Sequence, residues 1–351
     1  MAEVNLREIF ASSRLCLESM TIPDPDDITN PPAIDENYIF ALPVLNQLLL
    51  YLAYPQKDCL FLSGPAGCGK TSMALQTAAR LGWEVVQLTL SSRTEAFDLM
   101  GHATLRHGEL VYQYGPLVEA MNLGKILILN EIDLMPPGEL AALNDVLEGR
   151  ALTITQNNGE IIEPSPFFRV IATANTKGMG DAMGFYNGTR QLNQAFLDRW
   201  RFVEVGYPEK RVELKILKKR CSKLDDEILE KLVLLAQELR HTSCPEQGRA
   251  SLSAPFSTRS LVRVASLLNV CASLSVPKAL ETAFAARLPK EEREYVMRIC
   301  NDIFGNGSDD DALMGRQAPA ALLEPDELCE AKKAKSGIKK GKDEEGSCTA
   351  A

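Results

Sequence analysis

Apolar residues along the first two thirds of the chain follow two alternating patterns. Short apolar runs of strand length are separated by segments whose apolar residues recur at helical spacing. Strands that alternate with helices in this way predict an α/β fold, with a parallel five-stranded sheet sandwiched by helices. The predicted strands cover residues 58–63, 83–90, 125–129, 169–174 and 202–205. The predicted helices before and between them cover residues 42–54, 72–81, 115–122 and 137–148.

Two further segments of this part alternate in the manner of β-hairpins. One covers residues 105–114 around a His107-Gly108 turn, and the other surrounds Asn158 and Gly159, a strong hairpin signal. Ahead of the sheet, residues 4–20 have the spacing of an amphipathic helix, followed by a Pro/Asp-rich stretch. We expect this lead-in arm either to dock a partner or to pack on the body of the protein.

Beyond residue 207 the pattern becomes wholly helical. The predicted helices cover residues 209–221, 225–242, 257–274, 277–286 and 291–304. From residue 305 the composition changes to Gly, Ser, Asp, Ala, Lys and Glu, which predicts a disordered tail whose lysine run is either solvated or bound to an acidic partner. The expected division is an N-terminal arm (1–34), a sheet domain (35–207), a small all-α lid domain (208–304) and a charged tail (305–351).

Charge and cysteine usage narrow the functional classes. The chain has 351 residues and a formal net charge of −9, which argues against a protein whose main task is to bind nucleic acid. Its nine cysteines form no C-x-x-C pair, and His102, His107 and His241 have no metal-binding spacing, so we expect reduced thiols and no zinc site. Charged residues interrupt the N-terminal segment, and no apolar run is long enough for a membrane span. These features predict a cytoplasmic protein without a membrane segment.

A phosphate-binding loop follows the first predicted strand of the sheet. Its residues match the pattern G-x-x-x-x-G-K-[ST]: Gly64, Pro65, Ala66, Gly67, Cys68, Gly69, Lys70 and Thr71. Backbone N–H groups at the start of the following helix favour negative charge, Lys70 can reach the β- and γ-phosphates, and the Thr71 hydroxyl can ligate Mg²⁺. A glycine-rich turn could match by chance, but the strand before it and the helix after it are the context that the motif requires. The sequence therefore predicts ATP and Mg²⁺ as ligands.

Polar residues at the ends of two other predicted strands complete this chemistry. Asn130 and Glu131 end the strand at 125–129, where Glu131 can polarise the attacking water. Asn130 stands where an aspartate is usual, and its amide oxygen can accept a hydrogen bond from a Mg²⁺-bound water without adding charge. Asn175 ends the strand at 169–174, where it can contact the γ-phosphate. The alternative for the first pair is an ordinary polar strand end.

Arginines occur at two further positions of interest. Arg199 and Arg201 precede the last predicted strand, where an arginine can reach the nucleotide of a neighbouring subunit or simply pair with Asp198. Ser257 is a candidate N-cap for a helix of the second domain, and Arg259 in its first turn can lean over a bound nucleotide.

With these elements in order, the chain resembles the AAA+ ATPases of the MoxR and dynein-related group, and most closely the cobaltochelatase ATPase subunits (CobS-like). Residues 168–200, FRVIATANTKGMGDAMGFYNGTRQLNQAFLDRW, are the most specific part of the resemblance. The resemblance implies a AAA+ ATPase fold in which residues 64–71 are Walker A and Glu131 is the Walker B carboxylate. It also implies that Asn175 is sensor 1, Arg199 a finger acting on a neighbouring subunit, and Arg259 sensor 2.

The same resemblance implies a hexameric ring with ATP between subunits and a partner that carries a von Willebrand factor A domain. The client is then either an adhesion-domain protein, as for MoxR-type chaperones, or a chelatase subunit that inserts Co²⁺ into a corrin ring. Asn130 departs from the family pattern and leaves a weakly hydrolysing, nucleotide-gated scaffold open. A nucleic-acid-translocating motor is a second alternative, although the acidic balance disfavours it. Tyr38 and Phe40 are candidates either for adenine contacts or for core packing.

Overall fold

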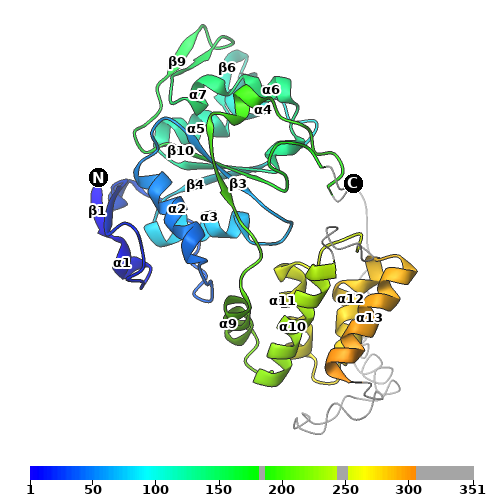
Figure 1. The fold of residues 1–351 in the computed structure, drawn as a ribbon. Helices are drawn as coiled ribbons and strands as arrows, with labels where there is room; N and C mark the ends of the chain where they lie inside the picture. Colours follow the sequence, from blue (N-terminus) through cyan, green and yellow to red (C-terminus); the bar gives the residue numbers. More distant parts are fainter. Residues whose placement is uncertain (182–185, 243–251, 306–351) are drawn as a thin grey trace, which may run out of the picture. The chain divides into compact units, whose positions relative to one another are not determined.

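The computed structural model describes residues 1–181, 186–242 and 252–305. Its centre is a sheet (Figure 1) of five parallel strands, whose order is β11-β3-β10-β7-β4. These strands are β3 (Cys59–Ser63), β4 (Val85–Thr89), β7 (Ile126–Asn130), β10 (Arg169–Ala174) and β11 (Trp200–Glu204). All five predicted strands are therefore confirmed, and so is their parallel arrangement.

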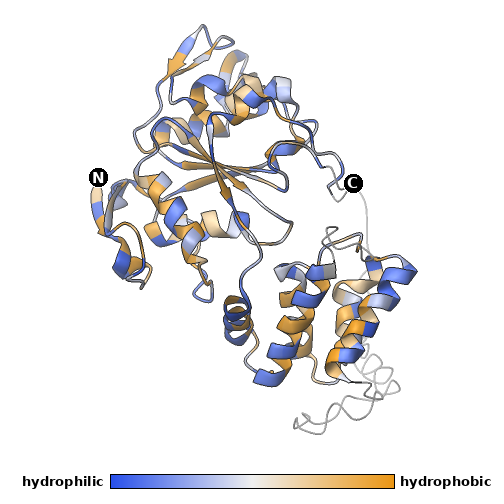
Figure 2. Ribbon diagram, viewed as in Figure 1, coloured by the Kyte–Doolittle hydropathy of each residue, from blue (hydrophilic) through white to orange (hydrophobic). Residues whose placement is uncertain are grey.

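The two faces of the sheet carry separate hydrophobic cores. Successive residues of β7 alternate between them, with Ile126 and Ile128 in one core and Leu127 and Leu129 in the other. The three inner strands, β3, β10 and β7, are buried along their whole length, which explains their continuous apolar sequences. Figure 2 shows the same strands as a hydrophobic centre.

Helices cover both faces of the sheet. One core includes side chains of α2 (Leu42–Ala53) and α3 (Lys70–Leu81), and the other includes side chains of α5 (Pro116–Leu123), α6 (Pro137–Ala141) and α7 (Asn144–Leu147). Two short helices, α4 (Ala96–Met100) and α8 (Gln194–Leu197), and two hairpins complete the region. The hairpin strands are β5 (Gly101–Arg106) with β6 (Glu109–Tyr114) and β8 (Leu152–Ile154) with β9 (Glu160–Ile162), as predicted.

The continuous helix predicted for residues 137–148 is wrong, because the segment forms α6 and α7 with a break between them. The N–H groups of Ala142 and Leu143 donate to carbonyls only three residues back, those of Glu139 and Leu140, at 3.2 and 3.0 Å. Such bonds tighten the turn and end the regular α-helical ladder.

The amphipathic helix predicted for residues 4–20 is also wrong. The segment pairs β1 (Ala2–Asn5) with β2 (Ser19–Ile22) in an antiparallel hairpin, and only the short α1 (Leu6–Ile9) is helical. The Asn5 side chain caps α1 by accepting from the Arg7 N–H at 3.0 Å, and Ala11 then adopts a positive φ of 48° that ends the helix. The segment packs in the same core as α2.

The chain after the sheet is helical and has a core of its own. It contains α9 (Lys210–Arg220), α10 (Asp226–Thr242), α11 (Thr258–Val270), α12 (Val276–Ala283) and α13 (Lys290–Phe304), which confirms the five helices predicted there (Figure 1). The predicted disordered tail lies outside the described residues apart from Gly305. Among the helices of the described ranges, none is both long and apolar enough to cross a membrane.

Candidate nucleotide site

The phosphate-binding loop joins the carboxyl end of β3 to the first turn of α3. Gly69, with φ of 102°, caps α3, and Gly67 has φ of 74°, so both positions favour glycine. At Gly64 the reason is steric as well, because a Cβ there would lie 2.1 Å from the carbonyl oxygen of Val205. The N–H groups of the first turn of a helix of this length form a favourable site for phosphate.

Lys70 connects the loop to the other predicted residues. Its side chain is buried, and Nζ donates to the carbonyl oxygens of Gly64 (2.7 Å) and Pro65 (3.1 Å) and to Oδ1 of Asn175 (3.0 Å). Burial lowers the pKa of Lys70, and these three oxygens stabilise its ammonium. Asn175 in turn donates from Nδ2 to Oε2 of Glu131 at 2.7 Å. The structure thus brings Lys70, Asn175 and Glu131 into one chain of contacts.

Thr71 and Asn130, the predicted Mg²⁺ residues, also meet. The Thr71 hydroxyl donates to Oδ1 of Asn130 at 2.7 Å, and the Thr173 hydroxyl donates to the same oxygen at 3.0 Å. The Asn130 amide nitrogen donates to the carbonyl oxygen of Leu88 at 3.2 Å, which fixes the orientation of the amide. Hydroxyl and amide oxygens suit Mg²⁺ and its bound waters, so these residues fit the ion. The amide supplies an oxygen but no charge.

Glu131 has an unusual backbone conformation and a carboxyl group with a raised pKa. Its backbone is left-handed, with φ of 55° and ψ of 44°, an uncommon conformation for glutamate that is typical of functional sites. Burial raises the pKa of its carboxyl, and the charge of Asp133 raises it further, while Lys70 and Arg259 act in the opposite direction. A raised pKa makes the carboxylate a stronger base.

Asp133 is a site residue that the sequence reasoning missed. It is fully buried, and its Oδ2 accepts from the Thr176 N–H (3.2 Å) and hydroxyl (2.7 Å), while its backbone carbonyl accepts from the Arg190 N–H at 2.7 Å. Its other carboxylate oxygen has no hydrogen-bond partner among the described residues. Because Thr176 follows Asn175, Asp133 ties the end of β10 to the segment after β7. A carboxylate so soon after the end of a buried strand was the available signal.

The start of α11 lies against the phosphate-binding loop. Ser257 caps this helix, as predicted, by accepting from the Ser260 N–H at 3.1 Å. A Cβ at Gly67 would come within 2.7 Å of the Ser257 hydroxyl oxygen and 3.4 Å of the Arg259 Cβ. Arg259 is exposed, and its charge influences the pKa values of both Lys70 and Glu131. The structure therefore brings Arg259 to the same site.

Arg199 is a predicted site residue that the structure does not bring to this site. It precedes β11, and its carbonyl accepts from the Cys59 N–H at 3.1 Å, so it lies at the amino edge of the sheet. The phosphate-binding loop follows the carboxyl edge. Its guanidinium pairs with Glu148, with Nε 2.7 Å from Oε1, and not with Asp198. The neighbouring Arg201 pairs with Asp58 at 3.0 Å.

Tyr38 and Phe40 lie in an aromatic cluster. The Tyr38 ring is 4.8 Å from that of Phe40, which is 5.2 Å from that of Phe10, and the Tyr38 hydroxyl is 3.9 Å from the Met73 sulfur. Both residues pack against the core that contains α2 and α3. These contacts agree with core packing and leave adenine contacts a prediction.

AAA+ ATPases have a phosphate-binding loop at the carboxyl edge of a parallel sheet with this strand order. A helical region follows that sheet along the chain. Two family profiles match the chain. The AAA domain (dynein-related subfamily) covers residues 59–200, and the CbbQ/NirQ/NorQ C-terminal region covers residues 213–300. The chain belongs to the dynein-related AAA+ ATPases and is MoxR-like, as the sequence resemblance implied.

Two curated relatives and one solved structure are similar to this chain. The aerobic cobaltochelatase subunit CobS of Sinorhizobium sp is 29% identical over 283 residues, which are 78% of this chain and 83% of that protein. An uncharacterized protein of Staphylococcus epidermidis is 30% identical over 242 residues, 67% of this chain and 86% of its own length. Among solved structures, RuvB, the Holliday junction branch migration motor of Thermotoga maritima, matches with a TM-score of 0.41 and 17% identity, covering 77% of this chain and 72% of that one.

Proposed function

We infer that this protein binds Mg²⁺-ATP and hydrolyses it in a hexameric ring of subunits to remodel a protein partner. The observation that carries this proposal is the continuous set of contacts from Lys70 through Asn175 to Glu131. It links the cation that binds phosphate to the carboxylate that can take a proton from water. Nucleotide binding follows from the family, and hydrolysis is the proposed step.

In this proposal each residue of the site has a separate task. Lys70 exchanges its carbonyl partners for the β- and γ-phosphates of ATP, whose stronger negative charge favours the exchange. Glu131 accepts the proton of the attacking water, helped by its raised pKa. Asn175 contacts both residues, so it can set the distance between the phosphate and the base. Arg259, on the start of α11, supplies positive charge beside the γ-phosphate.

Thr71 and Asn130 are the residues that would hold Mg²⁺, the first directly and the second through water. When bound, the ion neutralises charge on the phosphates. Because Asn130 is uncharged, this chain offers the ion less electrostatic attraction than a carboxylate would. The proposal therefore includes slow hydrolysis at low Mg²⁺ concentrations and saturation of the rate only at higher ones.

Arg199 is proposed to complete the site of the next subunit. Its place at the amino edge of the sheet supports this, since it cannot serve the phosphate-binding loop at the carboxyl edge of its own sheet. An arginine supplied in this way stabilises the charge of the transition state and accelerates hydrolysis by about 10³- to 10⁵-fold. Release of Arg199 from Glu148 would then accompany assembly.

The client is proposed from the relatives alone. Similarity to a cobaltochelatase subunit supports a chelatase partner, and the MoxR-like family supports a protein with a von Willebrand factor A domain. The same proposal has the chain working in the cytoplasm, which its free cysteines support. A pull-down from native cells would test these partners.

A steady-state ATPase assay tests the proposal. Wild type should turn ATP over, and Glu131→Gln should lower kcat by about 10²- to 10⁴-fold while ATP still binds. The matched control is Glu109→Gln, on the exposed hairpin strand β6, which should keep wild-type turnover. The assembly part is tested by mixing Arg199→Ala with Lys70→Ala, which should restore some activity if sites are shared. The absence of rescue at every mixing ratio would count against Arg199 acting on a neighbour.

A second function is favoured by one observation, the amide of Asn130 beside Thr71. A chain that binds ATP, assembles and hydrolyses very slowly would act as a nucleotide-gated scaffold. In that case turnover would be undetectable in wild type and unchanged by Glu131→Gln, while ATP would still drive assembly. Light scattering with ATP and with ADP separates this outcome from an inactive protein.

A further inference from the structure

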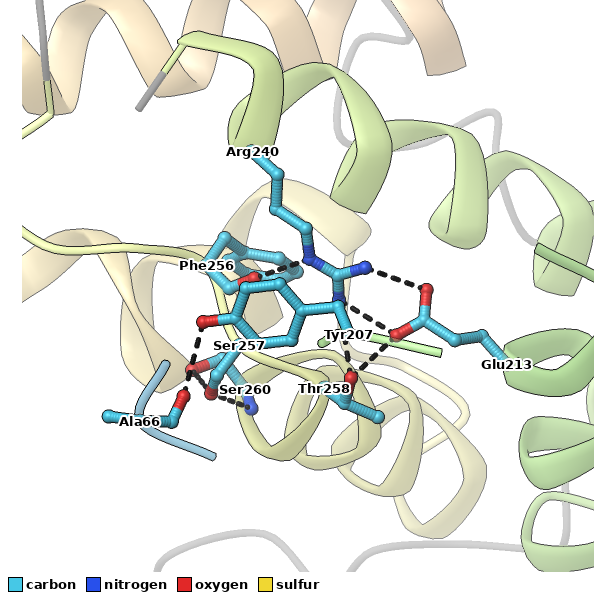
Figure 3. A network of polar contacts seen from close by, with 8 residues as sticks. All are labelled: Ala66, Tyr207, Glu213, Arg240, Phe256, Ser257, Thr258 and Ser260. Carbon is cyan, nitrogen blue, oxygen red and sulfur yellow. Dashed lines mark hydrogen bonds and ion pairs between the residues drawn. The ribbon is translucent and has the colours of Figure 1, made fainter. Parts of the chain in front are cut away.

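The backbone of Ala66, inside the phosphate-binding loop, is held by two tyrosines. Its N–H donates to the Tyr186 hydroxyl at 3.1 Å. Its carbonyl accepts from the Tyr207 hydroxyl at 3.1 Å (Figure 3). Tyr207 lies between β11 and α9, where the chain passes from the sheet to the helical region. One hydroxyl therefore connects the loop that binds phosphate to the segment that leads to the helices.

The ring of Tyr207 in turn contacts a buried ion pair. The Arg240 guanidinium lies over it, 4.3 Å from the ring centroid, a distance typical of a cation–π contact. Arg240 donates to both carboxylate oxygens of Glu213, at 2.9 and 2.8 Å. Glu213 is 1% exposed, so this bidentate ion pair is held in one geometry by burial as well as by its hydrogen bonds.

The same ion pair holds the start of α11. The Thr258 hydroxyl donates to Oε1 of Glu213 at 2.7 Å, and Nε of Arg240 donates to the carbonyl of Phe256 at 2.8 Å (Figure 3). These contacts fix the residues on both sides of the N-cap Ser257. Arg259 is the next residue after Thr258, so its position depends on this anchorage.

We propose that Tyr207 is a positioning residue that fixes Arg259 relative to the phosphate-binding loop through the Arg240–Glu213 pair. The inference rests on the proposed function, in which the loop takes ATP and Arg259 faces the γ-phosphate. The Tyr207 hydroxyl contacts a backbone carbonyl of the loop. The loop binds phosphate through its backbone N–H groups, which Tyr207 does not use. Loss of Tyr207 therefore weakens the contacts that depend on Arg259 and leaves the β-phosphate contacts in place.

The test is the affinity of the full chain for a non-hydrolysable ATP analogue and for ADP, measured by calorimetry. Tyr207→Phe keeps the ring under Arg240 and removes only the hydroxyl. Because one net hydrogen bond corresponds to about a 2- to 12-fold change in an equilibrium constant, the analogue should bind that much more weakly, while ADP affinity stays within about twofold. Arg240→Lys keeps the positive charge beside Glu213 but loses the paired hydrogen bonds to its carboxylate and the guanidinium contact with the Tyr207 ring. It should show the same loss of affinity for the analogue, with ADP affinity unchanged.

A double-mutant cycle with Arg259→Ala shows whether Tyr207 acts through that residue. Both single variants should lower affinity for the analogue, and Tyr207→Phe should have no further effect once Arg259 is alanine. Tyr51→Phe is the matched control, because it removes a buried hydroxyl that bonds the Val170 carbonyl at 2.8 Å within the sheet region. It should lower stability without changing the ratio of the two affinities.

Any of three results would overturn the inference. One is an equal loss of analogue and ADP affinity in Tyr207→Phe, another is no loss of either, and the third is an effect that persists in the Arg259→Ala background. A wild-type protein that binds neither nucleotide would overturn the proposed function as well, so the two failures are distinguishable.

Discussion

Replacement of Asn130 by aspartate tests how much the missing charge matters. Oδ1 would keep both hydroxyl donors, Thr71 and Thr173. The amide N–H that now reaches the Leu88 carbonyl at 3.2 Å would become a carboxylate oxygen facing another oxygen. Asn130 is 6% exposed, so water cannot readily relieve this contact. The loss of a buried donor costs about 1–3 kcal/mol of unfolding free energy.

The same charge should strengthen Mg²⁺ binding. Two unit charges 4 Å apart interact by about 4 kcal/mol at an effective dielectric constant of 20, and desolvation of the new carboxylate removes part of this gain. We therefore expect Asn130→Asp to lower the Mg²⁺ concentration for half-maximal ATPase activity about tenfold or more, since about 1.4 kcal/mol is a factor of ten. The folded protein without Mg²⁺ should at the same time be less stable.

Magnesium titrations of ATPase activity and thermal unfolding in chelator measure the two effects separately. Protonation lets the new carboxyl donate to the Leu88 carbonyl, so its pKa should be higher folded than unfolded. An acid whose pKa is raised by folding destabilises the folded state at pH values above its pKa in the unfolded chain, which is about 3.9 for aspartate. At lower pH the acid is protonated in both states and has no effect. The stability loss in chelator should thus appear as pH rises. Thr173→Val, which removes one donor without adding charge, should not tighten Mg²⁺. An unchanged Mg²⁺ requirement in Asn130→Asp would refute the reasoning.

Two further predictions concern the fold around the site. Burial acts to raise the pKa of Glu84, but the Asn30 N–H, Lys125 and Thr29 outweigh it and lower the pKa to about 2. Wild type should therefore lose about 1–3 kcal/mol of stability as pH falls from about 4.5 towards 2, and thermal melts should show a flatter profile in Glu84→Gln. Gly64→Ala should abolish nucleotide binding in a fluorescence titration, because its Cβ would lie 2.1 Å from the Val205 carbonyl. Gly138→Ala, with open space around the new Cβ, should bind normally.

The sheet could be predicted from sequence because its strands are set by local pattern. β3, β7 and β10 are buried on both faces, so most of their residues are apolar whichever face they occupy. Because the strands are parallel, the residues at their carboxyl ends lie at the same edge of the sheet. That rule alone brings Asn130, Glu131 and Asn175 to the phosphate-binding loop.

Long-range pairing accounts for the errors at the N-terminus. Leu6, Met20 and Ile22 are buried against α2, and their strand pairing joins residues such as Val4 and Met20 across a loop. Helical spacing in a short segment says nothing about a partner strand that lies outside the window. The break between α6 and α7 has a similar origin, since it depends on backbone bonds three residues back and not on a glycine or proline.

Contacts between charged residues on different helices were the least predictable part of the site. In sequence, Glu213 and Arg240 look like ordinary solvent-facing charges of two amphipathic helices. The structure buries Glu213 almost completely, and removal of Arg240 alone would leave a buried, uncompensated carboxylate at a cost of about 3–5 kcal/mol. This pair contacts Tyr207, whose hydroxyl donates to the carbonyl of Ala66 in the phosphate-binding loop. The contacts that hold the start of α11 therefore come from residues outside the phosphate-binding loop and the strand ends.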